Sequence, residues 1–127
     1  MRLILVRHAE AAPGEPDALR PLTPGGRTSA RALGARLAVE RPDAVVSSPL
    51  LRARETADQI ARAAGVVATV DERLAPGATA SGLREVIGDL GATVVVVGHQ
   101  PDCSEILVAL GGEDRPFAPG AAAVIEL

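Results

Sequence analysis

The sequence predicts an α/β fold, a three-layer α/β/α sandwich around a central, mainly parallel sheet. Short β-branched runs alternate with longer amphipathic segments, and this alternation is typical of βα units. The expected strands are continuous apolar runs, which indicates that they are covered on both faces. With 127 residues, the chain has the length of one domain, and we expect a single domain over residues 1–127.

Five apolar runs have the length and composition of strands. We expect them near residues 2–7, 43–47, 66–70, 93–98 and 121–126. Between them, the segments 11–22 and 114–120 are rich in Pro, Gly and acidic residues and are predicted to be surface loops. Neither loop is long enough to fold a lid over a pocket, so we expect any active site to be open.

Four helices are expected between the strands. The first should begin at Thr23, a good N-cap followed by Pro24, and end by Pro42. The pair Ser48-Pro49 predicts the start of the second helix in the same way, with Ser48 as N-cap and Pro49 at the first helical position. The other expected helices are 81–90, capped by Ser81, and 102–112, closed by a glycine pair; Arg54 and Glu55 are expected on a solvated helix face.

Composition excludes several function classes. The net charge of −3 argues against general binding to nucleic acid or anionic membranes, and Phe117 is the only aromatic residue, so no base-stacking platform exists. The run at residues 1–6 is too short for a signal peptide, and no stretch is long enough to span a bilayer. Cys103 is the only cysteine and is expected to be a small buried hydrophobe. We therefore expect a soluble, cytoplasmic protein, monomeric because no apolar seam is evident.

Both histidines stand where a predicted strand ends. His8 follows residues 3–7, His99 follows residues 94–98, and Arg7 directly precedes His8. Arg52 is expected in the first turn of the second helix. Because ligands of open α/β sheets gather at the carboxyl ends of the strands, these four side chains can face one pocket.

Two arginines and two histidines suit a phosphoryl group. Arginine forks hold the equatorial oxygens, and a neutral imidazole can attack phosphorus. Neighbouring guanidinium charges favour the neutral form of His8, whereas His99 is expected to donate a hydrogen bond as a cation. The alternative is that both histidines are satisfied strand-end residues and that Arg7 and Arg52 are surface charges. Two histidines without clustered acids or cysteines predict no metal site, and this chemistry needs no cofactor.

The chain resembles the histidine phosphatase superfamily, which includes phosphoglycerate mutases, and within it the short SixA-type phosphohistidine phosphatases. The resemblance is collinear over nearly the whole chain and rests on four motifs: VRHAEA at 6–11, RPLTPGG at 20–26, SSPLLRARETA at 47–57 and VGHQP at 97–101.

The resemblance implies a phosphoglycerate mutase-like fold and a phosphohistidine intermediate on His8. Arg7, Arg52 and His99 would bind and polarise the phosphoryl group. Arg20 would either reach the pocket mouth or pair with Asp17 or Glu15.

One position departs from the superfamily pattern. Many members carry a catalytic acid after the third strand, where this chain has Ala75 and Pro76. An alkoxide leaves poorly without an acid, whereas imidazole departs readily from protonated phosphohistidine, so the gap favours a P–N substrate in a phosphorylated protein of the phosphorelay type. Glu10, which we also expect to contact substrate, or Glu72 could substitute for the acid. Two alternatives stay open, namely a broad small-molecule phosphomonoesterase with Glu10 as acid and a catalytically idle phosphate-binding module.

Overall fold

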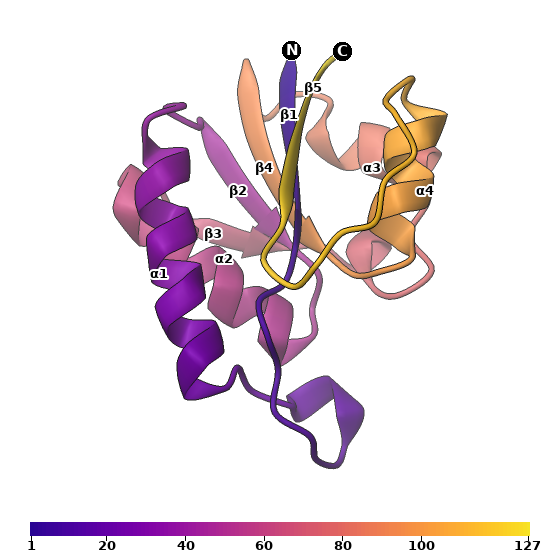
Figure 1. Cartoon of the computed structure of the whole chain (residues 1–127). Coiled ribbons are helices and arrows are strands. Elements are labelled where there is room, and N and C mark those ends of the chain that lie inside the picture. Colours follow the sequence, from indigo (N-terminus) through magenta and orange to yellow (C-terminus); the bar gives the residue numbers. More distant parts are fainter.

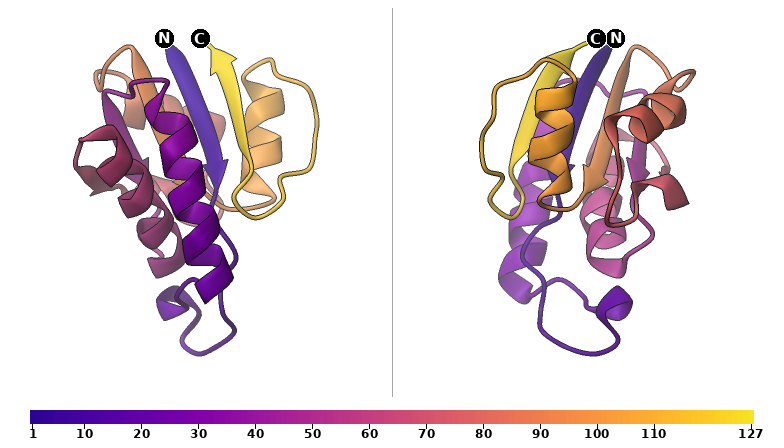
Figure 2. Two further views of the ribbon diagram at one scale, coloured as in Figure 1. Left: turned by 60° about the vertical axis from the view of Figure 1, so that its left-hand side comes forward. Right: turned by 90° about the vertical axis from the view of Figure 1, so that its right-hand side faces the viewer.

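In the computed structural model, which describes all residues 1–127, a five-stranded sheet lies between two pairs of helices (Figures 1 and 2). The strands are β1 (Arg2–Arg7), β2 (Ala44–Ser47), β3 (Ala68–Val70), β4 (Thr93–Gly98) and β5 (Ala122–Glu126). The helices are α1 (Pro24–Ala38), α2 (Leu51–Ala64), α3 (Ala80–Ile87) and α4 (Asp102–Ala109), with short 3₁₀ turns at Asp17–Leu19 and Glu72–Leu74. The predicted three-layer fold is confirmed.

The strand order is β3-β2-β4-β1-β5. The first four strands run parallel, and β5 pairs antiparallel with β1. In Figure 1 β1, β2 and β4 point downward, so their carboxyl ends meet at the lower edge, beside the loop that follows β1. The sheet is mainly parallel, as predicted.

The two edge strands differ from the prediction that every strand is covered on both faces. β3 is shorter than the expected run, and Val70 at its end is half exposed, as is Val124 in β5. An edge strand has a neighbour on one side only, and the helices cover the central strands first. The central strands β1 and β4 are almost fully buried.

Four of the predicted helix boundaries change, namely the start of α2, both ends of α3 and the end of α4. Thr23 caps α1 as expected, its hydroxyl accepting from the Gly26 N–H at 2.9 Å. The second helix begins at Leu51 and not at Ser48-Pro49. Its N-cap is Leu50, and no side chain caps it. Thr79, not Ser81, caps α3, which ends at Ile87. The fourth begins at Asp102 and ends at Ala109.

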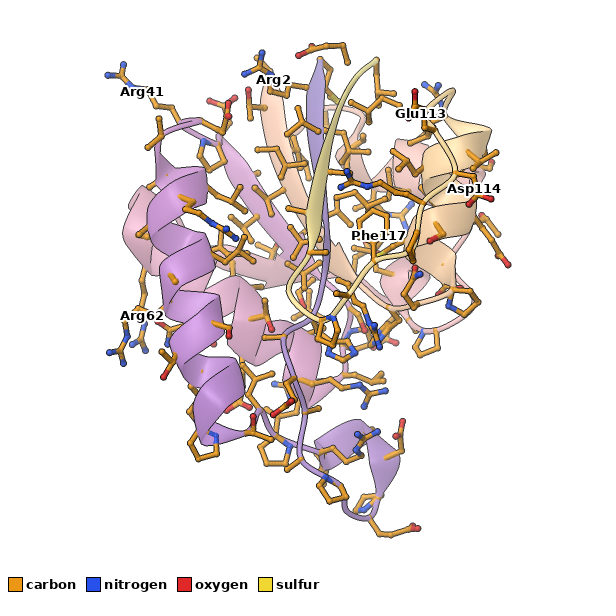
Figure 3. All side chains as sticks on the ribbon, in the orientation of Figure 1. Arg2, Arg41, Arg62, Glu113, Asp114 and Phe117 are labelled. Carbon is orange, nitrogen blue, oxygen red and sulfur yellow. The ribbon has the colours of Figure 1, made fainter.

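Two apolar clusters fill the space on the two faces of the sheet. One lies under α1 and α2, and the other, under α3 and α4, includes Phe117 from the loop before β5. Figure 3 shows Phe117 between the strands and α4, whereas Arg2 and Arg41 lie at the amino end of the sheet. Phe117 is almost fully buried, so it anchors this loop to the core.

The contact between α1 and α2 depends on a glycine. A Cβ atom on Gly34 would lie 2.7 Å from the backbone oxygen of Gln59 and 3.3 Å from the Ile60 Cα. Backbone atoms of a packed helix cannot move aside as a flexible side chain can, so α1 can approach α2 this closely only without a side chain at position 34.

We expect Gly34→Ala to lower the free energy of unfolding by about 1–3 kcal/mol, because the added methyl group forces the two helices apart. Gly25→Ala in the same helix is the control, since its new Cβ would meet only the Thr23 hydroxyl at 3.9 Å. Urea unfolding measures both variants. Equal stability of the two variants would contradict the close packing.

Candidate active site

The pairing of β1 with β4 brings the two histidines together. Arg7 lies opposite Gly98 in the parallel register, and the His8 N–H continues the ladder by donating to the Gly98 oxygen at 3.0 Å. The imidazole centroids of His8 and His99 are 5.3 Å apart, with the rings tilted by 59°. Both strand-end histidines therefore reach one point at the carboxyl edge of the sheet, as the sequence predicts.

A backbone carbonyl fixes the tautomer of His8. Its Nδ1 lies 2.7 Å from the Ala9 oxygen, and because a carbonyl only accepts, Nδ1 carries the hydrogen. Burial lowers the pKa of His8, and the positive charges of Arg52 and Arg7 lower it further. His8 is therefore neutral at pH 7 with a free lone pair on Nε2. The sequence predicts a low pKa of His8 from the arginine charges alone, but burial lowers this pKa more than the arginines do.

His99 is held by a serine from the loop after β2. Its Nε2 lies 2.7 Å from the Ser48 Oγ, which also accepts from the Leu50 N–H at 3.2 Å. Burial, the neighbouring His8 and the charge of Arg52 lower the pKa of His99 to about 4. The imidazole of His99 is therefore neutral at pH 7, and its burial is a feature that the sequence does not show.

The two predicted arginines point into the same site. Arg7 donates from Nη1 to the Phe117 oxygen at 2.8 Å, while its Nε is buried and donates to no protein acceptor. Arg52 comes from the first turn of α2 and is almost fully buried. Its Nη1 donates to the Asp17 oxygen at 2.9 Å. The reading of these arginines as surface charges is wrong, since both contact backbone inside the site.

Arg20 fits both roles that the sequence left open. Its Nη1 donates to the Asp17 Oδ1 at 3.1 Å, its Nε donates to the Ala12 oxygen at 2.8 Å, and it lines the same pocket as the histidines. Asp17 also contacts Arg52, with Oδ2 3.2 Å from Nη2. The hydrogen bonds from Arg20 and Arg52 lower the pKa of Asp17.

These side chains surround a pocket of about 340 Å³. It is lined by Arg7, His8, Asp17, Arg20, Arg52, Pro76, His99 and Gln100. No aliphatic or aromatic hydrocarbon side chain other than the proline ring lines it, and three guanidinium groups face one carboxylate. The pocket is thus suited to a small oxyanion.

The stretch after the third strand brings no carboxylate into the pocket. Pro76 lines it there, and Ala75 does not. The neighbouring Gly77 N–H donates to the buried Asp102 Oδ2 at 2.8 Å, which ties this loop to the start of α4. Glu72, considered as a substitute acid, does not line the pocket.

Glu10 lies away from the pocket, contrary to the expectation that it contacts substrate. Its carboxylate accepts from the Thr23 hydroxyl at 2.8 Å, at the N-terminus of α1. Glu55 is also not on a solvated face as expected, because it accepts from the Leu22 N–H at 2.8 Å and pairs with Arg27 at 3.2 Å. Both acids hold the loop after β1 and the start of α1.

The sequence does not identify three residues of the site, Asp17, Ser48 and Gln100. Asp17 was considered only as a partner of Arg20, and Ser48 only as a helix start. Cys103, by contrast, is buried as predicted, with Sγ 3.7 Å from the Val6 oxygen. Burial raises the pKa of this thiol to about 12, so it is uncharged.

A family model for the histidine phosphatase superfamily, branch 1, matches residues 3–76. The chain belongs to this superfamily. The matched segment contains Arg7, His8, Arg20 and Arg52, and His99 lies beyond it.

Solved structures of phosphatases resemble this chain over most or all of its length. The protein histidine phosphatase SixA, solved with tungstate, superposes with a TM-score of 0.88 and 26% identity, over 100% of this chain and 88% of that one. A mycobacterial glucosyl-3-phosphoglycerate phosphatase gives a TM-score of 0.69 and 25% identity, over 86% and 78%. An uncharacterized protein of Picosynechococcus is 37% identical over 115 residues, 83% of this chain and 70% of that one. Family and neighbours together support a phosphatase.

None of the helices has the length and apolar character needed to cross a membrane. Histidine, cysteine and acidic side chains do not gather in groups of three or more that could hold a metal ion.

The low pKa of His99 predicts a pH-dependent stability. In the unfolded chain His99 titrates near its ordinary pKa of about 6.5, so the unfolded state binds more protons than the folded state between about pH 6.5 and 4. The free energy of unfolding should therefore be highest above pH 6.5 and fall by about 2–3 kcal/mol as the pH drops through this window.

We expect His99→Gln to flatten this pH dependence, because glutamine does not titrate. His8 has the same sign of shift and leaves a residual slope. Urea unfolding of wild type and variant at pH 7 and pH 4.5 measures the difference, and parallel profiles for the two proteins would contradict the assigned cause.

Proposed function

We propose that the protein removes the phosphoryl group from phosphohistidine on a partner protein, through a covalent phosphohistidine intermediate on His8. The observation that carries this proposal is the bond from His8 Nδ1 to the Ala9 oxygen at 2.7 Å, which leaves the Nε2 lone pair for attack. The arginines and the second histidine beside it supply the charge and the donors that a phosphoryl group requires.

In the first step His8 Nε2 attacks phosphorus and the bond from phosphorus to the leaving group breaks. Arg7 and Arg52 bind the phosphoryl oxygens, and a bound oxygen would satisfy the buried Arg7 Nε–H. In the second step water attacks phosphorus, the bond to Nε2 breaks, and phosphate leaves while His8 returns to its neutral form.

His99 contributes a hydrogen bond to the phosphoryl group in both steps. Its low pKa of about 4 applies to the unliganded pocket. A bound phosphoryl dianion raises the pKa of a neighbouring imidazole, so His99 gains positive charge when substrate binds and not before. Ser48 holds the ring in place through its bond to Nε2.

The substrate class follows from the missing acid. Pro76 lines the pocket in the stretch after β3 and no carboxylate from that stretch does, while Glu10 lies outside. A leaving alkoxide would have no acid to protonate it, whereas protonated phosphohistidine needs none. The structural neighbour SixA is described as a protein histidine phosphatase, which supports the same class. The glucosyl-3-phosphoglycerate phosphatase neighbour keeps a small phosphoester as the second candidate.

We expect His8→Ala to abolish phosphate release, by a factor of about 10³ or more, because the nucleophile is lost. The measurement is phosphate release from a phosphorylated phosphotransfer domain, with circular dichroism to show that the variant keeps its fold. Turnover that survives in a folded His8→Ala protein would overturn the assignment of the nucleophile. A wild type that binds phosphate but releases none would indicate a binding module.

We expect phosphohistidine to be turned over with a higher kcat/KM than serine phosphate or a sugar phosphate, since only the imidazole leaves without an acid. Glu10→Gln is the matched test of the phosphomonoesterase alternative. If Glu10 is not an acid of the reaction, the variant keeps the kcat/KM of wild type on every substrate. Equal turnover of esters and phosphohistidine, or loss of ester turnover in Glu10→Gln, would support the alternative instead.

A further inference from the structure

Asp17 is the only acidic residue that lines the pocket. Its Oδ1 accepts from Arg20 at 3.1 Å and its Oδ2 lies 3.2 Å from Arg52 Nη2, while its backbone oxygen accepts from Arg52 Nη1 at 2.9 Å. Three contacts from two arginines hold this loop residue in one place. The carboxylate is therefore a fixed part of the site, although nothing in the motifs assigns it a role.

Asp17 lies on the solvent side of the pocket. Its side chain is 64% exposed, whereas His8 and His99 are 9% and 4% exposed. His8 attacks phosphorus from the buried side, and an in-line displacement expels the leaving group in the opposite direction. The leaving group of the substrate therefore emerges at the mouth, where Asp17 is.

The carboxylate at this mouth is an anion and not an acid. The hydrogen bonds from Arg20 and Arg52 lower the pKa of Asp17, so it has no proton to give at neutral pH. It cannot replace the acid that is missing near Pro76. It can accept a hydrogen bond from a leaving group that already carries an N–H.

Protonated phosphohistidine is such a leaving group. Its ring carries phosphorus on one nitrogen, a hydrogen on the other, and a positive charge. When His8 Nε2 bonds to phosphorus and the P–N bond breaks, the electron pair returns to the ring nitrogen, and neutral imidazole leaves with its hydrogen still in place. A carboxylate facing that N–H stabilises the protonated ring up to the point of departure.

An ester leaves differently. Its oxygen takes the electron pair and gains negative charge, which Asp17 repels at the mouth. The same residue thus favours one class of leaving group and disfavours the other. Each carboxylate oxygen has more than one lone pair, so Oδ2 can accept a hydrogen bond from the ring while it keeps its contact with Arg52.

We propose that Asp17 is a specificity-determining residue, which selects protonated imidazole leaving groups over anionic ones. This inference rests on the proposed phosphohistidine phosphatase function and adds the residue that sets its preference.

The test is the ratio of kcat/KM for a phosphohistidine protein to kcat/KM for an aryl phosphate, in wild type and Asp17→Asn. This parameter covers transfer to His8 and not the later hydrolysis, which is common to both substrates. Asparagine keeps the shape and an oxygen acceptor for the arginines but loses the charge. We expect the ratio to fall by about threefold to tenfold, the range for a charge-assisted hydrogen bond at a partly exposed site.

Two further variants separate specificity from structure. Glu15→Gln removes an exposed acid from the same loop and should leave the ratio unchanged. Asp17→Glu keeps the charge and should restore part of the ratio. If Asp17 only positions the arginines, Asp17→Asn lowers both values of kcat/KM equally, and the unchanged ratio overturns the proposal. A wild type inactive on phosphohistidine would instead overturn the proposed function itself.

Discussion

The parallel pairing of β1 with β4 is the constraint on which the rest of the site depends. The ladder continues one residue past both strands, through the bond from the His8 N–H to the Gly98 oxygen. A slip by one residue would turn the side chains of β1 to the opposite face of the sheet. Because both faces of these strands are fully packed, such a slip would disrupt two apolar clusters at once. The packing of the core thus fixes the distance between His8 and His99.

The buried arginines and histidines of the site need hydrogen-bond acceptors that do not cancel the positive charge of the arginines. Backbone carbonyls supply most of them, since Ala9, Phe117 and Asp17 accept from His8, Arg7 and Arg52. A carbonyl satisfies a donor without adding a full negative charge, so the pocket stays attractive to an oxyanion. The two imidazoles stay neutral because burial lowers their pKa values. The arginines therefore give the site its positive charge, and the neutral imidazoles add none.

The sequence predicts the elements well where the signal is local, and less well where a distant partner decides. Apolar runs locate all five strands, and strand ends locate both histidines. Ser48-Pro49 has the local pattern of a helix start, but the Ser48 hydroxyl bonds to His99, 51 residues away. The contact of Asp17 with Arg52 spans 35 residues, and the depth at which His99 lies is a property of the packed molecule. No rule of sequence spacing predicts these contacts. For the same reason the sequence does not show that Glu10, two residues after His8, bonds to the Thr23 hydroxyl.

The pocket divides into an inner part and a rim with different structural origins. The inner part, His8, His99, Arg7 and the first turn of α2, is attached to the central strands, and a change there disturbs the core. The rim comes from two loops, the segment around Asp17 and the turn at Pro76, which are held by a few polar contacts. In the proposed mechanism the inner part binds and attacks the phosphoryl group, whereas the leaving group meets the rim. Substrate preference can then change through loop residues while the residues on the central strands stay the same, which is consistent with one fold occurring in both a protein histidine phosphatase and a glucosyl-3-phosphoglycerate phosphatase among the structural neighbours.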